Sequence, residues 1–166
     1  NWKNNKRWSD RFLPQIKGII GTHLIAEPPF EEDAERNTDL MVLRLDAIRI
    51  GCRVRRFKFA AHHSNEFTIR EGLPNGTKTE LTKIVEGWGD YFFYGFSDES
   101  EARLSSWSLC DLNVFRIWLS RELARNKGET PGRSKTNHDG SSSFRIFDLR
   151  DLPREFVVAR EQHGRA

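Results

Sequence analysis

Apolar and polar residues alternate clearly between residues 47 and 56. A strand over this range would carry apolar side chains on one face and mostly arginines on the other, in the order Ile48, Arg49, Ile50, Gly51, Cys52, Arg53, Val54, Arg55. A second apolar run, 39–45, comes just before it, and the link through Leu45–Asp46 is short enough for a hairpin. The pattern therefore predicts two paired strands, with arginines on one face of the second.

Apolar residues recur at helical spacing in three further segments. The predicted helices run from Ser9 to about Ile20, from Thr77 to about Trp88, and over 112–125. Thr77 and Glu80 have the spacing of a capping box, and Asp111 is the predicted cap of the last helix.

Short apolar or aromatic runs predict three more strands, at 66–70, 91–96 and 144–147, the second of them central and buried on both faces. The order is then helix, three strands, helix, strand, helix and a last strand. This order predicts an α/β (α+β) fold in which helices flank a mixed β-sheet. The 166 residues are expected to form one domain. Its predicted parts are a core over 1–125, a flexible loop over 126–143, and a C-terminal strand with a charged tail over 144–166.

The charged residues are unevenly distributed, although the net charge is only +3. Residues 49–58 contain four arginines and a lysine without an acid, whereas 27–35 contain five acidic residues. This asymmetry suits a basic groove with a separate acidic edge, and it makes DNA or RNA a reasonable partner. Solvated surface charge explains the same pattern without a partner.

The cysteines and the hydropathy bear on the cellular compartment. Cys52 and Cys110 lie far apart in apolar contexts, which favours buried free thiols and a reducing, cytoplasmic environment. No apolar run approaches the roughly 20 residues of a membrane span, and no signal-peptide pattern opens the chain, so a membrane partner is not expected. The adjacent His62 and His63 would point apart on a strand, and loop histidines are the simpler interpretation.

Most aromatic residues fit core positions better than binding positions. This group includes Trp88, Phe92, Phe93, Trp107 and Trp118. Trp2 and Trp8 stand beside Lys3, Lys6 and Arg7 and are freer to contact a partner. Aromatic rings can also stack on unpaired bases, so a stacking role is a second interpretation.

The predicted order of elements resembles the core of the restriction-endonuclease-like, or PD-(D/E)XK, nucleases. Several short motifs are similar to those of phage and mobile-element proteins over roughly residues 8–118: Asn-Thr-Asp-Leu, Arg-x-Arg, Glu-Phe-Thr-Ile-Arg, Lys-Thr-Glu-Leu and Gly-Trp-Gly-Asp-Tyr. In the nuclease superfamily an aspartate opens the second strand, and the third strand carries a carboxylate, any residue and a lysine. The carboxylates hold Mg²⁺, which activates a water for phosphodiester hydrolysis.

The resemblance places Asp39 at the aspartate position, but the third-strand position carries Arg53 and Arg55 instead of an acid and a lysine. Arginine can grip phosphate but can neither bind Mg²⁺ nor lose its proton near neutral pH. Glu66 would then have to supply the second metal ligand, and Lys78 would orient the water or contact phosphate. The simpler alternatives are a turn cap for Asp39 and a strand-edge position for Glu66.

Three functions follow from these observations. The first is Mg²⁺-dependent hydrolysis of nucleic acid with Asp39, Glu66 and Lys78 as the catalytic residues. The second is a catalytically inactive nucleic-acid-binding module on the same fold. The third is a phage-encoded protein that binds a host protein through the acidic stretch 27–35. In the first two, contacts to the nucleic acid are predicted for Arg49, Arg53, Arg55, Lys78 and Lys83.

Overall fold

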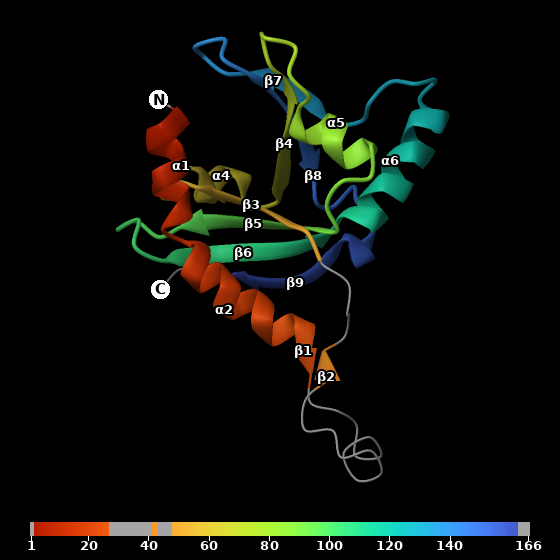
Figure 1. The fold of residues 1–166 in the computed structure, drawn as a ribbon. Coiled ribbons are helices and arrows are strands. Elements are labelled where there is room, and N and C mark those ends of the chain that lie inside the picture. Colours follow the sequence, from red (N-terminus) through yellow and green to blue (C-terminus); the bar gives the residue numbers. More distant parts are fainter. Residues whose placement is uncertain (1, 27–40, 43–47, 163–166) are drawn as a thin grey trace, which may run out of the picture.

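The computed structural model describes residues 2–26, 41–42 and 48–162, which form a mixed α/β structure (Figure 1). The helices are α1 (Trp2–Asp10), α2 (Leu13–Leu24), α4 (Ala60–His63), α5 (Glu80–Val85) and α6 (Leu112–Arg125), with short 3₁₀ helices η1 (Phe57–Phe59) and η2 (Arg154–Phe156). The strands are β1 (Ile25–Ala26), β2 (Met41–Val42), β3 (Ile50–Arg55), β4 (Glu66–Gly72), β5 (Tyr91–Ser97), β6 (Leu104–Asp111), β7 (Arg133–Thr136), β8 (Ser143–Asp148) and β9 (Val157–Gln162). None of the helices in these ranges is long and apolar enough to cross a membrane.

Two main sheets form the body of the structure. The four-stranded sheet has the order β3-β5-β6-β9, in which β3 runs parallel to β5 and the other pairs are antiparallel. The three-stranded sheet has the order β4-β8-β7 and is antiparallel throughout. Figure 1 shows α2 along one face of the four-stranded sheet, with the three-stranded sheet, α5 and α6 on the other side.

The predicted hairpin of 39–45 with 47–56 is wrong for the residues that the structure describes. β3 pairs with β5, whereas Met41–Val42 pairs with Ile25–Ala26. Parallel pairing sets β3 beside the aromatic β5, which is buried from Phe92 to Ser97. β3 and β4 also belong to different sheets, so the strands at 50–55 and 66–72 do not lie side by side.

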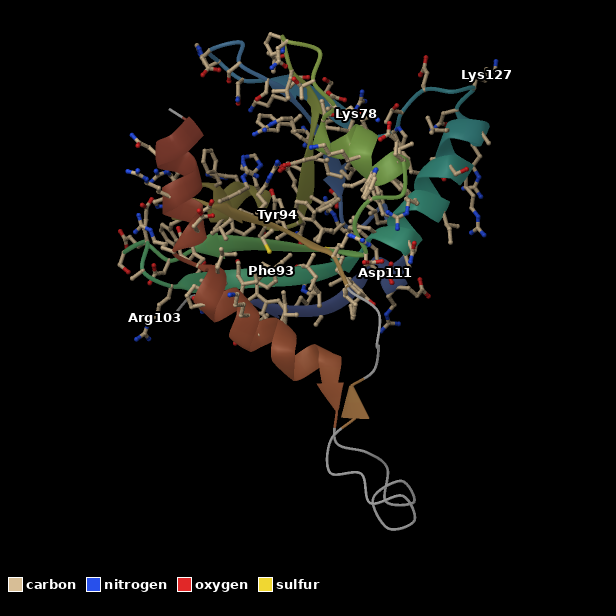
Figure 2. The ribbon with its side chains drawn as sticks, viewed as in Figure 1. Lys78, Phe93, Tyr94, Arg103, Asp111 and Lys127 are labelled. Carbon is tan, nitrogen blue, oxygen red and sulfur yellow. The ribbon has the colours of Figure 1, made fainter. Side chains whose placement is uncertain are left out.

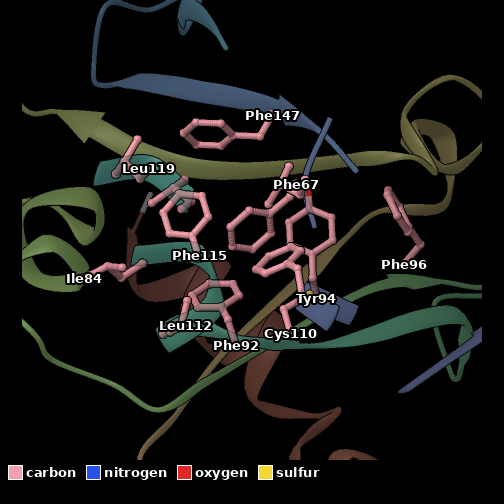
Figure 3. Close-up of a cluster of buried hydrophobic side chains, with 13 residues drawn as sticks. Phe67, Ile84, Phe92, Tyr94, Phe96, Cys110, Leu112, Phe115, Leu119 and Phe147 are labelled. Carbon is pink, nitrogen blue, oxygen red and sulfur yellow. The ribbon is translucent and has the colours of Figure 1, made fainter. Parts of the chain in front are cut away.

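The two faces of β5 build two separate cores. Phe92, Tyr94 and Phe96 join the cluster between the two sheets, while Phe93 points to the opposite face and packs with Phe12 and other residues under α2. Figure 3 shows the first cluster, in which Phe67, Phe115 and Phe147 lie close together. The prediction of a central strand at 91–96 that is buried on both faces is therefore confirmed.

The helix predictions hold in part. Asp111 caps α6 as predicted, because its Oδ1 accepts from the backbone N–H groups of Asn113 and Val114 at 2.7 and 3.2 Å. The predicted helix from Ser9 is wrong at both ends. Ser9 lies inside α1, a new helix starts at Leu13, and this helix continues past Gly21 to Leu24.

Two further expectations are corrected around α5 and β7. The cap of α5 is Thr79 rather than Thr77, and it accepts from the backbone of Thr82 at 3.3 Å. The segment 126–143, predicted to be a loop, contains β7, which pairs with β8. The prediction that Trp88 is a core residue is also wrong, because Trp88 is 60% exposed.

The two cysteines differ in burial. Cys110 is fully buried between the sheets, as predicted, and burial raises the pKa of its thiol to about 12. The prediction of a buried thiol is wrong for Cys52, which is exposed on β3. Both thiols are free.

Candidate functional site

A groove of about 800 Å³ runs between β3 and the three-stranded sheet. Its walls come from β3, β4, β7 and β8 and from residues of α1, η1, α4 and α5. Most of its charged side chains are basic: the groove is lined by Arg53, Arg55, Arg56, Arg70, Lys135, His63, His138, Glu66 and Glu80. Phosphate is the common biological group that matches such a surface.

The alternation of β4 explains how this strand serves both the core and the groove. Phe67 and Ile69 are fully buried in the cluster between the sheets. The residues between and beside them, Glu66, Thr68 and Arg70, line the groove. The two-residue period of a strand therefore presents Arg70 to the groove while the core holds its backbone in place.

Arg53 is held mainly by the protein itself. Its guanidinium forms an ion pair with the Glu80 carboxylate and donates to the backbone oxygen of Thr68 at 2.9 Å. The same Glu80 oxygen accepts from the backbone N–H of Arg70 at 3.1 Å. Glu80 is thus not part of the predicted capping box, and it joins β3 to β4 at the start of α5.

Arg55 and Arg70 differ from Arg53 in their contacts. Arg55 donates to the Tyr94 hydroxyl at 3.2 Å, and this hydroxyl lies 2.7 Å from the Thr68 hydroxyl. Figure 2 shows Tyr94 above β5, toward β4. The Nε of Arg70 is buried without a hydrogen-bond partner among the described residues. Within the same part of the chain neither arginine pairs with a carboxylate.

The Arg56 side chain fixes α1 to the wall of the groove. Its guanidinium contacts both Glu101 carboxylate oxygens at 2.5 and 2.8 Å and lies 4.6 Å from the centre of the Trp8 ring. The Trp8 indole N–H donates to the same carboxylate at 2.7 Å. The hydrogen bond from Arg56, followed by that from Trp8, lowers the pKa of the Glu101 carboxyl. Trp8 is consequently a fixed part of the groove wall.

The residues predicted to be catalytic are not brought together within the described structure. Glu66 lines the groove, but its oxygens accept from His63 Nδ1 at 2.6 Å and from Arg133 at 2.9 Å. Lys78 forms an exposed ion pair with Glu86 at 2.7 Å and does not line the groove; Figure 2 places it beside α5. Asp39 lies outside the described residues.

These contacts also decide how well Mg²⁺ fits. Within residues 2–26, 41–42 and 48–162, no three His, Cys, Asp or Glu side chains come together as a metal site. Both oxygens of Glu66 are engaged by nitrogen donors. The described donor set therefore does not suit a hard cation that needs free carboxylate oxygens. The role of Asp39 as a metal ligand stays a prediction.

Of the five basic residues predicted to contact nucleic acid, Arg53 and Arg55 line the groove, whereas Arg49, Lys78 and Lys83 do not. Arg56, Arg70 and Lys135 also line the groove, although none of them was predicted to contact nucleic acid. Arg70 shares a strand face with Glu66, so the two-residue period could have identified it. Lys135 carried no such signal, because its segment was predicted to be a loop.

The fold and the groove define a mixed α/β protein with an arginine-lined groove. No protein-family model matches the chain, and neither a curated protein nor a solved structure matches it.

Proposed function

We propose that the protein binds nucleic acid and holds its phosphate backbone in this groove. The observation that carries the proposal is the pair Arg55 and Arg70, which line the groove and pair with no carboxylate of the described residues. Guanidinium groups bind phosphate through two parallel hydrogen bonds, and an arginine without a carboxylate partner keeps a net positive charge that a phosphate can neutralise.

The charge balance of the groove supports the same function. Five arginine or lysine side chains line it against two glutamates, and one of the five, Arg56, is already paired with Glu101. One glutamate, Glu80, is occupied by Arg53, and the other, Glu66, by His63 and Arg133. A run of phosphates would satisfy the excess of cations and release counterions from the nucleic acid, which is the main source of affinity in such complexes.

Binding is a better match to these contacts than hydrolysis. The restriction-endonuclease-like core and the phage resemblance remain predictions, and the binding proposal needs neither. The acidic stretch 27–35, proposed to contact a host protein, lies outside the described residues. Mg²⁺-dependent cleavage is an additional outcome that the binding experiment can record, with Asp39→Ala as its control.

The test is a titration of labelled oligonucleotides at several salt concentrations. We expect Arg55→Ala combined with Arg70→Ala to weaken binding by at least about 100-fold, because each of the two lost charged hydrogen bonds contributes about 1.5–3 kcal/mol. The slope of log affinity against log salt should fall by about two. Unfolding curves of both proteins would check that the variant folds.

The matched control is Arg121→Ala combined with Arg125→Ala. Both arginines are exposed on α6, and neither lines the groove, so the net charge falls equally without altering the site. The control should bind about as tightly as the unmodified protein. Equal losses in the two double variants, or no binding at low salt, would contradict the proposal.

A second prediction concerns Glu80. Glu80→Gln keeps the side-chain length and an oxygen for the Arg70 backbone N–H but removes the charge that neutralises Arg53. We expect binding to tighten about three- to tenfold, since one more cation becomes available. Stability should fall by only about 1 kcal/mol, because the Glu80 side chain is 34% exposed. Weaker binding in a folded Glu80→Gln variant would show that Arg53 does not contact the ligand.

A further inference from the structure

We infer that the groove selects single-stranded nucleic acid, with unpaired bases stacking on arginine–aromatic pairs in its wall. The inference rests on the proposed function and adds the class of ligand to it. It adds three aromatic side chains of the groove wall to the arginines that the proposed function uses.

Three aromatic rings line the groove, and each lies near an arginine from the β3 segment. The guanidinium-to-ring distances are 5.8 Å for Arg53 and Phe144, 4.6 Å for Arg55 and Phe59, and 4.6 Å for Arg56 and Trp8. The arginines come from one short stretch of chain, whereas the rings come from β8, η1 and α1. Three elements distant in sequence thus contribute a ring each to one groove.

The three rings are partly exposed, and packing holds two of them in place. Trp8, Phe59 and Phe144 are all partly exposed, unlike the fully buried Phe67 and Phe93. Phe59 packs at the edge of the cluster between the sheets, and Trp8 packs at the edge of the cluster under α2. The core therefore holds both rings in place, so little side-chain entropy remains to be lost when a base stacks on them.

This wall distinguishes single strands from duplexes. In a duplex the flat faces of the bases are covered by their neighbours, so partly exposed rings beside the phosphates have nothing to stack on. In a single strand every base offers a face, and stacking on aromatic rings or guanidinium planes contributes regardless of sequence. A groove lined by both cations and aromatic rings can bind a strand through both its phosphates and its bases.

The experiment compares three probes: a thymidine oligonucleotide of about 12 nucleotides, the same chain without bases, which has the same number of phosphates, and a duplex of that length, which has twice as many. We expect the strand with bases to bind at least about 10-fold more tightly than the other two, given about 1–3 kcal/mol for each stacked base. Phe59→Leu keeps an apolar side chain but removes the ring. It should weaken binding of the strand with bases about 10-fold and leave binding of the abasic chain unchanged.

Trp88→Leu is the matched control, because Trp88 is an exposed aromatic residue that does not line the groove. It should bind all three probes like the unmodified protein. Phe144→Leu is the second groove variant and keeps the test valid if Phe59→Leu fails to fold. Equal binding of the abasic chain, or tighter binding of the duplex, would overturn the inference and leave the proposed function intact. No binding of any probe at low salt would overturn both.

Discussion

Replacing Phe67 by alanine is expected to lower the free energy of unfolding by about 3–5 kcal/mol. Phe67 is fully buried, and its ring lies 5.1–5.8 Å from those of Phe156, Phe92, Phe115 and Tyr94. These rings belong to both sheets and to α6 and η2, so the cavity would open where all these elements meet. A loss of this size is a large part of the stability of an ordinary domain.

Denaturant unfolding of the purified variants measures this effect. Phe57→Ala is the control, because Phe57 is 44% exposed and should cost less than about 1 kcal/mol. Phe67→Leu should fall between the two, since it leaves a smaller cavity. A similar cost for Phe67→Ala and Phe57→Ala would mean that the cluster between the sheets does not hold the fold together.

The second large effect is expected at Gly132, where Gly132→Ala should cost about 3 kcal/mol. Gly132 has a φ of +85°, and an added Cβ would lie 2.5 Å from the backbone oxygen of Ile146. Backbone atoms of a paired strand cannot move aside easily, so the clash adds to the cost of the left-handed conformation. The clash would push β7 away from β8 and carry Lys135 out of the groove wall.

The comparison that isolates the clash is Gly128→Ala. Gly128 has a similar φ of +91° but no atom within 4 Å of its added Cβ, so this variant should lose only about 1 kcal/mol. Denaturant unfolding gives the two costs, and hydrogen exchange of the β7 amides reports the local displacement. Equal costs for the two variants would show that β7 can shift without penalty.

Local patterns in the sequence predicted the elements better than their pairing. The capping aspartate of α6 and the buried aromatic strand β5 were found because their signals lie within a few residues. The partner of β3 could not be found in this way. β3 pairs with β5, and the chain between them contains β4, a strand of the other sheet, and the helix α5. Nothing local in residues 47–56 indicates β5 as the partner.

Only some of the residues that line the groove were predicted, because local patterns do not show which distant residues come together. Arg53 and Arg55 were found from alternation along one strand. Whether an arginine is neutralised depends on carboxylates elsewhere in the chain: Glu80 occupies Arg53, whereas Arg55 contacts Tyr94. Phe59 and Phe144 gave no recognisable signal, because their shared place in the groove wall exists only after the two sheets have packed together.

The strands of the two main sheets are interleaved along the sequence, and this order affects how the chain can fold. The strands of the four-stranded sheet are drawn from residues 50–162, and all three strands of the other sheet lie inside that span. Each of the two sheets takes strands from both sides of α6, so neither is complete before the chain beyond α6 has joined it. Long loops must close before β3 meets β5 and β4 meets β8, and such high contact order slows folding. Fragments cut between α6 and β7 are therefore poor starting points for isolating a folded groove, since each lacks strands of both sheets.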